Sequence, residues 1–177
     1  MSRATLPTTG NVKPLTRRDF FSAVSAVVQA NLPPDPRTLQ TRQTMNLLKL
    51  HYGANYRVHY EAWIAAERGL LELGLHFEDG PASTERLLAF FDRYILEIKH
   101  ELGVEAELER WTQSWGHLHE VRPLEPLTLE FAASVGMRLT RYITLLQPLL
   151  DEAYDTGLVP KDPRPSTFHE RFRNRRG

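Results

Sequence analysis

The chain has 177 residues, of which 41% are hydrophobic and 25% are charged, as is typical of a single globular domain. Its 22 basic and 22 acidic residues cancel, so no net charge draws the whole protein to nucleic acid or to an anionic membrane. The absence of cysteine excludes disulfides, thiolate catalysis and iron–sulfur clusters, which leaves histidine and oxygen ligands for a metal. No apolar run approaches the ~20 residues that span a bilayer.

The charge is unevenly distributed along the chain. Residues 1–18 and 161–177 each carry a net charge of +4, and the residues between them carry −8. Segment 1–15 is rich in Thr, Pro and Gly and is expected to be a disordered arm. We therefore expect one domain over residues 16–157 and a basic tail over 158–177. This tail is the one segment expected to contact nucleic acid, weakly and without sequence preference.

A helix is predicted after the Thr16 N-cap, with Asp19 three positions later. Its apolar residues recur with helical spacing: Phe20, Phe21, Val24, Val27 and Val28. Leu32 and the prolines after it end the pattern. The pair Arg17-Arg18 followed by two phenylalanines also resembles a twin-arginine export signal. Polar residues interrupt the apolar stretch, which favours a core helix in a cytoplasmic protein, and export stays the alternative.

Three consecutive segments alternate between apolar and polar residues, the pattern of a strand with one buried face. They are residues 48–52, 58–64 and 71–78. The short connections between them predict an antiparallel meander. The loop lengths pair Tyr52 with Val58 and Ile64 with Leu71.

The second half of the chain contains two helices and two strands by the same criteria. A helix is predicted over residues 83–102, a fourth strand over 104–108 and a fifth over 115–121. The last helix begins after Thr128. Pro148 is expected to kink or end that helix, because proline removes a backbone donor.

These elements predict a two-layer α+β domain with the order α-β-β-β-α-β-β-α. Its five-stranded antiparallel sheet is expected to carry helices on one face. This order of elements resembles that of class I type III secretion chaperones, without a shared motif. A likeness in element order says little about function.

Histidines and acidic residues gather on the sheet face away from the helices. The expected register places His51, His59 and His76 in one row across three strands, with Glu61 and Glu78 beside it. Three imidazoles and a carboxylate suit zinc or another divalent transition metal. An ordinary solvated sheet face also carries such residues, so both interpretations stay open.

The pair His117 and His119 repeats this pattern on the fifth strand. Neighbouring apolar residues leave the facing of that strand ambiguous, so the pair supports the metal interpretation weakly.

The same polar face carries a tryptophan. Trp63, with Arg57 and Glu72, is a candidate partner-binding surface, since aromatic anchors are enriched at interfaces. No phosphate-binding loop, nucleophile elbow or zinc-protease helix motif occurs in the sequence. The leading hypothesis is therefore a non-enzymatic, homo-oligomeric interaction or chaperone-like module without a cofactor. The alternative is a metal-binding protein or metal-dependent enzyme that uses the histidine row.

Overall fold

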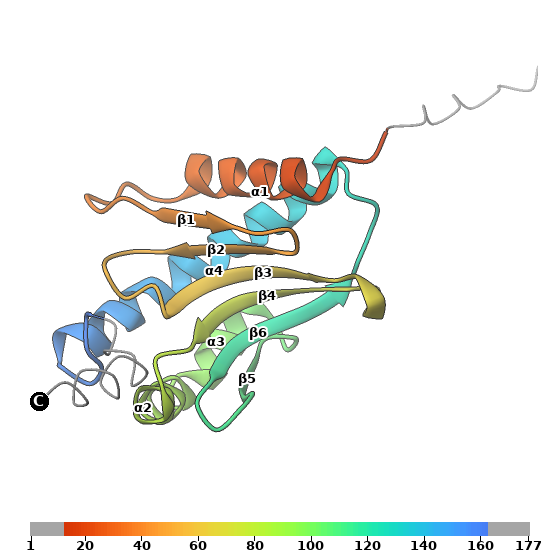
Figure 1. Cartoon of the computed structure of the whole chain (residues 1–177). Coiled ribbons are helices and arrows are strands. Elements are labelled where there is room, and N and C mark those ends of the chain that lie inside the picture. The colour runs from red at the N-terminus through yellow and green to blue at the C-terminus, as the bar shows by residue number, and fades with distance from the viewer. Residues whose placement is uncertain (1–12, 163–177) are drawn as a thin grey trace, which may run out of the picture.

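A computed structural model of the protein describes residues 13–162 (Figure 1). Most of the predicted arm over residues 1–15 and of the basic tail over 158–177 lies outside this range. The helices are α1 (Arg17–Asn31), the 3-10 turn η1 (Ala66–Arg68), α2 (Pro81–Asp92), α3 (Ile95–Leu102) and α4 (Leu129–Asp155). The strands are β1 (Gln40–Gln43), β2 (Leu47–His51), β3 (Val58–Ala65), β4 (Leu70–Phe77), β5 (Glu107–Arg110) and β6 (Gly116–Pro123).

The strands form a single antiparallel sheet in the order β1-β2-β3-β4-β6-β5. The predicted fold class is confirmed, with a sheet of six strands in place of five. The additional strand is β1, which pairs with β2 at the edge of the sheet. Its residues, Gln40-Thr41-Arg42-Gln43, are all polar, so the alternation that reveals a half-buried strand is missing.

One face of the sheet is apolar and packs against helices, as predicted. Its buried side chains come from β2, β3, β4 and β6: Leu48, Leu50, Val58, Tyr60, Ala62, Ile64, Leu71, Leu73, Leu75, Phe77 and Leu118. Behind the strands in Figure 1 runs α4, which buries Val135, Leu139 and Ile143. Along α4 lies α1, with the rings of Phe20 and Phe131 stacked at 5.5 Å. Burial of these side chains is the main stabilising contribution to the fold.

The first helix forms where the sequence predicts it. The Thr16 hydroxyl accepts a hydrogen bond from the Asp19 N–H at 3.1 Å, which caps α1. Phe20, Phe21 and Val24 are buried, so this segment is a core helix of the domain. Export stays an untested alternative. Within residues 13–162 no helix combines the length and the apolar character that crossing a membrane requires.

The prediction of one helix over residues 83–102 is wrong. Instead α2 ends at Asp92, and α3 begins at Ile95 after the turn at Arg93 and Tyr94. The turn lets α3 contact α4 and bury Ile98 and Leu102. Since the apolar spacing continues through the turn, hydrophobic periodicity does not reveal it.

The last helix does not end at Pro148, one of the two outcomes expected there, but continues to Asp155. The Pro148 side chain is exposed, while Leu150 and Ala153 beyond it are buried. Packing of this last turn against the core outweighs the loss of one backbone hydrogen bond.

One charged pair lies within the apolar layer and joins the sheet to two helices. Arg138 of α4 donates to the Glu120 carboxylate of β6 at 2.8 Å and also to the Leu102 carbonyl at the end of α3. The Tyr142 hydroxyl donates to the same carboxylate at 3.2 Å. Since Glu120 is only 8% exposed, it depends on Arg138 for its counter-charge.

We therefore expect Arg138→Met to lower the free energy of unfolding by about 3–5 kcal/mol, because it leaves a buried carboxylate unpaired. Urea denaturation followed by circular dichroism measures this loss. Arg141→Met is the control, since Arg141 is exposed on the same helix. This substitution should lower the free energy of unfolding by less than about 1 kcal/mol. Equal losses in the two variants would contradict a stabilising role for the pair.

Candidate functional site

The expected register of the three predicted strands that correspond to β2, β3 and β4 is confirmed, and it brings the histidines into one row. His59 of β3 lies opposite His76 of β4, and His51 lies at the β2 end of the row. The row continues beyond the prediction: His76 lies opposite His117 of β6, and His117 lies opposite Glu109 of β5. Polar side chains from five adjacent strands therefore share one level of the sheet.

This polar face is buried where the row crosses it, so the interpretation as a solvated face is wrong there. His59, His76 and His117 are 0%, 2% and 3% exposed. Part of the cover is Trp111, from the connection between β5 and β6. Its ring stacks on His117 at 5.7 Å and meets His76 edge-on at 6.4 Å.

A single carboxylate oxygen lies among three imidazoles. Glu72 Oε1 is 3.1 Å from His117 Nδ1, 3.2 Å from His119 Nδ1 and 3.6 Å from His76 Nε2. On the other side, Glu109 Oε2 is 3.7 Å from His117 Nε2 and 3.6 Å from His119 Nε2. We call these five residues the Glu72 cluster.

The Glu72 cluster contains more hydrogen-bond acceptors than N–H donors, because its two carboxylates add acceptors to those of the three imidazoles. His117 and His119 stack at 3.6 Å between the two carboxylates, and a neutral imidazole has one N–H, so each can donate to only one of them. Buried nitrogens are left without a hydrogen bond to any described residue: His76 Nε2, His117 Nε2 and both ring nitrogens of His119. Such a group of unsatisfied imidazole nitrogens beside two carboxylates calls for a bound cation or for additional protons.

The electrostatic surroundings keep ligands of the Glu72 cluster in the forms that bind metals. Burial lowers the pKa of His76 to about 3, so this imidazole is neutral at pH 7. Burial also works to raise the pKa of Glu72, but the adjacent His117 and His119 overcome it and hold the pKa well below its usual range. The cluster therefore offers an ionised carboxylate beside a neutral imidazole.

A second group of polar residues lies further along the row and contains a lysine. Lys49 Nζ is 3.0 Å from Glu78 Oε2 and 3.3 Å from Glu61 Oε2. His59 Nε2 is 3.1 Å from the same oxygen of Glu61. We call these four residues the Lys49 cluster. Ligand atoms of His59, Glu61 and Glu78, together with one of His76, all lie within 4.8 Å of one another.

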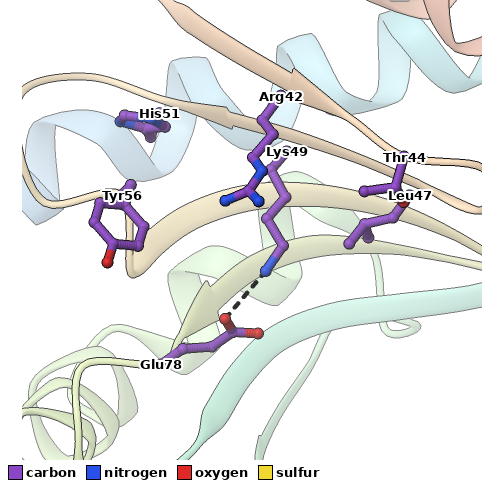
Figure 2. Close-up of a pocket in the computed structure, with 7 residues that line it drawn as sticks. All are labelled: Arg42, Thr44, Leu47, Lys49, His51, Tyr56 and Glu78. Atoms are coloured by element: carbon purple, nitrogen blue, oxygen red, sulfur yellow. Dashed lines mark hydrogen bonds and ion pairs between the residues drawn. The ribbon is translucent and has the colours of Figure 1, made fainter. Parts of the chain in front are cut away.

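A pocket of about 310 Å³ opens beside the Lys49 cluster. Figure 2 shows Lys49 reaching across it to Glu78, with Arg42 alongside and His51 and Tyr56 at one end. The pocket connects the buried cluster to solvent, and its size suits an ion or a small molecule.

The structure brings together most of the metal ligands that the sequence predicts. His59, His76, Glu61 and Glu78 form one potential ligand group, whereas His51 lines the pocket and belongs to no such group among the described residues.

Of the predicted partner-binding residues, Trp63 and Glu72 lie opposite each other on β3 and β4, whereas Arg57 lies just before the start of β3. Trp63 is half-buried, and Glu72 is the centre of an imidazole cluster. Arg57 lies over the Tyr56 ring at 5.9 Å. The more exposed indoles are those of Trp111 and Trp115, at 49% and 40%.

The part of the Glu72 cluster that comes from β5 and β6 does not follow from the sequence prediction. Glu109 lies just beyond the predicted fourth strand, and the facing of His117 and His119 is ambiguous in the sequence. The signal that could have found them is the shared period of two, with Glu107 and Glu109 on one strand and His117 and His119 on its partner.

No known protein family matches this chain, and comparison with curated proteins finds no match.

Gly74 lies between the two clusters and permits the close approach of β4 and β6. It is paired with Glu61 on one side and His119 on the other. A Cβ at this position would lie 2.3 Å from the Leu118 carbonyl oxygen and 2.8 Å from the His119 Cβ. Both contacts are too short for real atoms, so a side chain would push the strands apart.

Gly74→Ala is therefore expected to lower the melting temperature by more than about 2 °C, since a loss of 1 kcal/mol lowers it by about 2–4 °C in a domain of this size. Differential scanning calorimetry measures the shift. Gly157→Ala is the control, because Gly157 has a φ of 69° but open space around it, so it reports backbone strain without overlap. A smaller shift in Gly74→Ala than in the control would show that the strands accommodate the added methyl group.

Proposed function

We propose that the protein binds a divalent transition metal, zinc above all, in the Glu72 cluster. The observation that carries this proposal is the position of Glu72 Oε1 within 3.1–3.6 Å of nitrogens from three imidazoles. In a tetrahedral zinc site with bonds of 2.0–2.1 Å, neighbouring ligand atoms lie about 3.4 Å apart. The distances from Glu72 Oε1 are close to this spacing, and the ligand atoms of Glu72, His76 and His117 all lie within 4.8 Å of one another. Glu72, His76 and His117 form the primary ligand set.

The charge of the cluster supports a cation. Neither Glu72 nor Glu109 forms an ion pair with a lysine or arginine in the described part of the chain; their charged contacts are to histidines. A divalent ion would neutralise both carboxylates and occupy the lone pairs of the orphaned imidazoles at once. Protonation of the two stacked imidazoles would instead place like charges 3.6 Å apart.

The burial of the cluster favours holding the ion over using it in catalysis. Trp111 covers His117, and Glu109 and His119 stand next to the primary ligands as further donors. Catalytic zinc sites keep an open position for water or substrate, whereas structural sites are closed by protein ligands. The proposal is therefore a metal-binding, non-catalytic role.

The interaction or chaperone-like module and its homo-oligomeric state stay predictions, as does the cytoplasmic location. The half-buried position of Trp63 gives this hypothesis no specific support, so the metal hypothesis takes precedence.

Untagged protein stripped of metal with a chelator is expected to bind one equivalent of Zn²⁺ and to melt at a higher temperature once loaded. His117→Ala should weaken binding by more than the roughly 10–100-fold loss that follows from mutating a residue hydrogen-bonded to a metal ligand. His100→Ala is the matched control, because the His100 side chain is 84% exposed and lies outside both clusters. Competitive titration against a chromophoric chelator gives the affinities. Wild-type protein that binds no Zn²⁺, or an equal loss in the two variants, would refute the proposal.

The coordination geometry can be tested with Co²⁺, which absorbs far more strongly in the visible range when four-coordinate than when six-coordinate. We expect an intense visible spectrum from one equivalent of Co²⁺, and its loss in Glu72→Gln, because an amide is a poorer ligand than a carboxylate. Glu97→Gln, a change in the first turn of α3, should leave the spectrum unchanged. A weak, octahedral spectrum in wild-type protein would contradict a tetrahedral site.

A further inference from the structure

The Lys49 cluster resembles the Glu72 cluster in its ligands but differs in having a built-in cation. Its carboxylates, Glu61 and Glu78, each lie within 3.3 Å of the Lys49 ammonium. The Glu61 side chain is 8% exposed and the other two are 22% exposed, so solvent screens these charges only partly. The ammonium group thus occupies the position between the carboxylates that a metal ion would take.

The hydrogen bonding of His59 supports a cation site at this position. His59 Nδ1 lies 3.0 Å from the Tyr56 carbonyl oxygen and Nε2 lies 3.1 Å from Glu61 Oε2, and both of these oxygens only accept hydrogen bonds. A neutral imidazole carries one N–H, so it donates to one of the two oxygens and turns a lone pair toward the other. Two acceptors this close repel each other unless a cation lies beside them.

We propose that His59, Glu61 and Glu78 form a second divalent transition-metal site, and that the Lys49 ammonium occupies it and excludes the metal. The choice of ion rests on the proposed function, but the site is a separate set of residues. His76 belongs to both potential ligand groups, and the second site retains three ligands when His76 stays with the first ion. Zinc binds to His nitrogen and to Asp or Glu oxygen, and catalytic zinc sites have three protein ligands with a fourth position open.

The pocket gives both the ion and the lysine a place to move. Lys49 and Glu78 line it, so an ion entering from solvent reaches the carboxylates directly (Figure 2). The ammonium would leave the carboxylates for the same pocket. Lys49 thus sets the metal content of the protein: one ion while it is paired, and two once it is removed or displaced.

The test compares two substitutions at one position. Lys49→Met removes the charge and keeps a long side chain, whereas Lys49→Arg keeps the charge. With Zn²⁺ as the probe and equilibrium dialysis followed by elemental analysis, we expect one equivalent in wild type, one in Lys49→Arg and two in Lys49→Met. The second equivalent should disappear in Lys49→Met with His59→Ala, and persist in Lys49→Met with His117→Ala, where the first site is removed.

Stability gives an independent measurement. Metal-free Lys49→Met should melt at a lower temperature than wild type, since its two carboxylates lack a counter-charge, and Zn²⁺ should restore the melting temperature. One equivalent in Lys49→Met together with one in wild type would overturn the second site and leave the first intact. No equivalent in wild type and one in Lys49→Met would refute the Glu72 site and support this one. Two equivalents in wild type would show that Lys49 does not exclude the metal.

Discussion

The pairing register between β3 and β4 is the constraint on which the rest of this structure depends. Residues of a strand alternate between the two faces of a sheet, so a shift by one residue would exchange the faces completely. In the observed register Tyr60 lies beside Leu75 in the apolar layer, and His59 lies beside His76 on the opposite side. The hydrophobic contacts of β3 and β4 with α4 fix this register, and the polar face is assembled as a consequence.

Because that polar face is buried, its carboxylates require a counter-charge. The two clusters differ in how this counter-charge is supplied. In the Lys49 cluster a tethered ammonium compensates two carboxylates. In the Glu72 cluster no lysine or arginine among the described residues pairs with Glu72 or Glu109, and imidazole nitrogens are left without hydrogen bonds. A cation from solvent would satisfy the second arrangement without placing like charges together.

Compensation by a lysine and compensation by a metal are alternatives with different consequences. A lysine is always present and cannot be removed by a chelator, whereas an ion couples the stability of the domain to its concentration. The two clusters are adjacent and their potential ligand groups share His76, so one sheet face would combine a permanent cation with an exchangeable one. At the pocket next to Lys49, both the lysine and an incoming metal ion would be in contact with solvent.

The sequence by itself determined the elements whose side chains alternate or repeat with a clear period. The strands at 58–64 and 71–78, their register and the row His51, His59 and His76 followed from alternation and loop length, because both are local properties of the chain. The edge strand β1 has no apolar face, and the turn at Arg93 interrupts no periodicity, so neither left a signal.

Tertiary structure decided which of the polar residues came together and how deeply they were buried. Glu72 is separated by 45 residues from His117, and only the pairing of β4 with β6 brings them into contact. The turn between β5 and β6 places Trp111 against His117. The same turn therefore helps to exclude solvent from that end of the histidine row. Local patterns report the face on which a side chain lies, whereas its burial depends on residues distant in sequence that pack over it, and these are set by the fold as a whole.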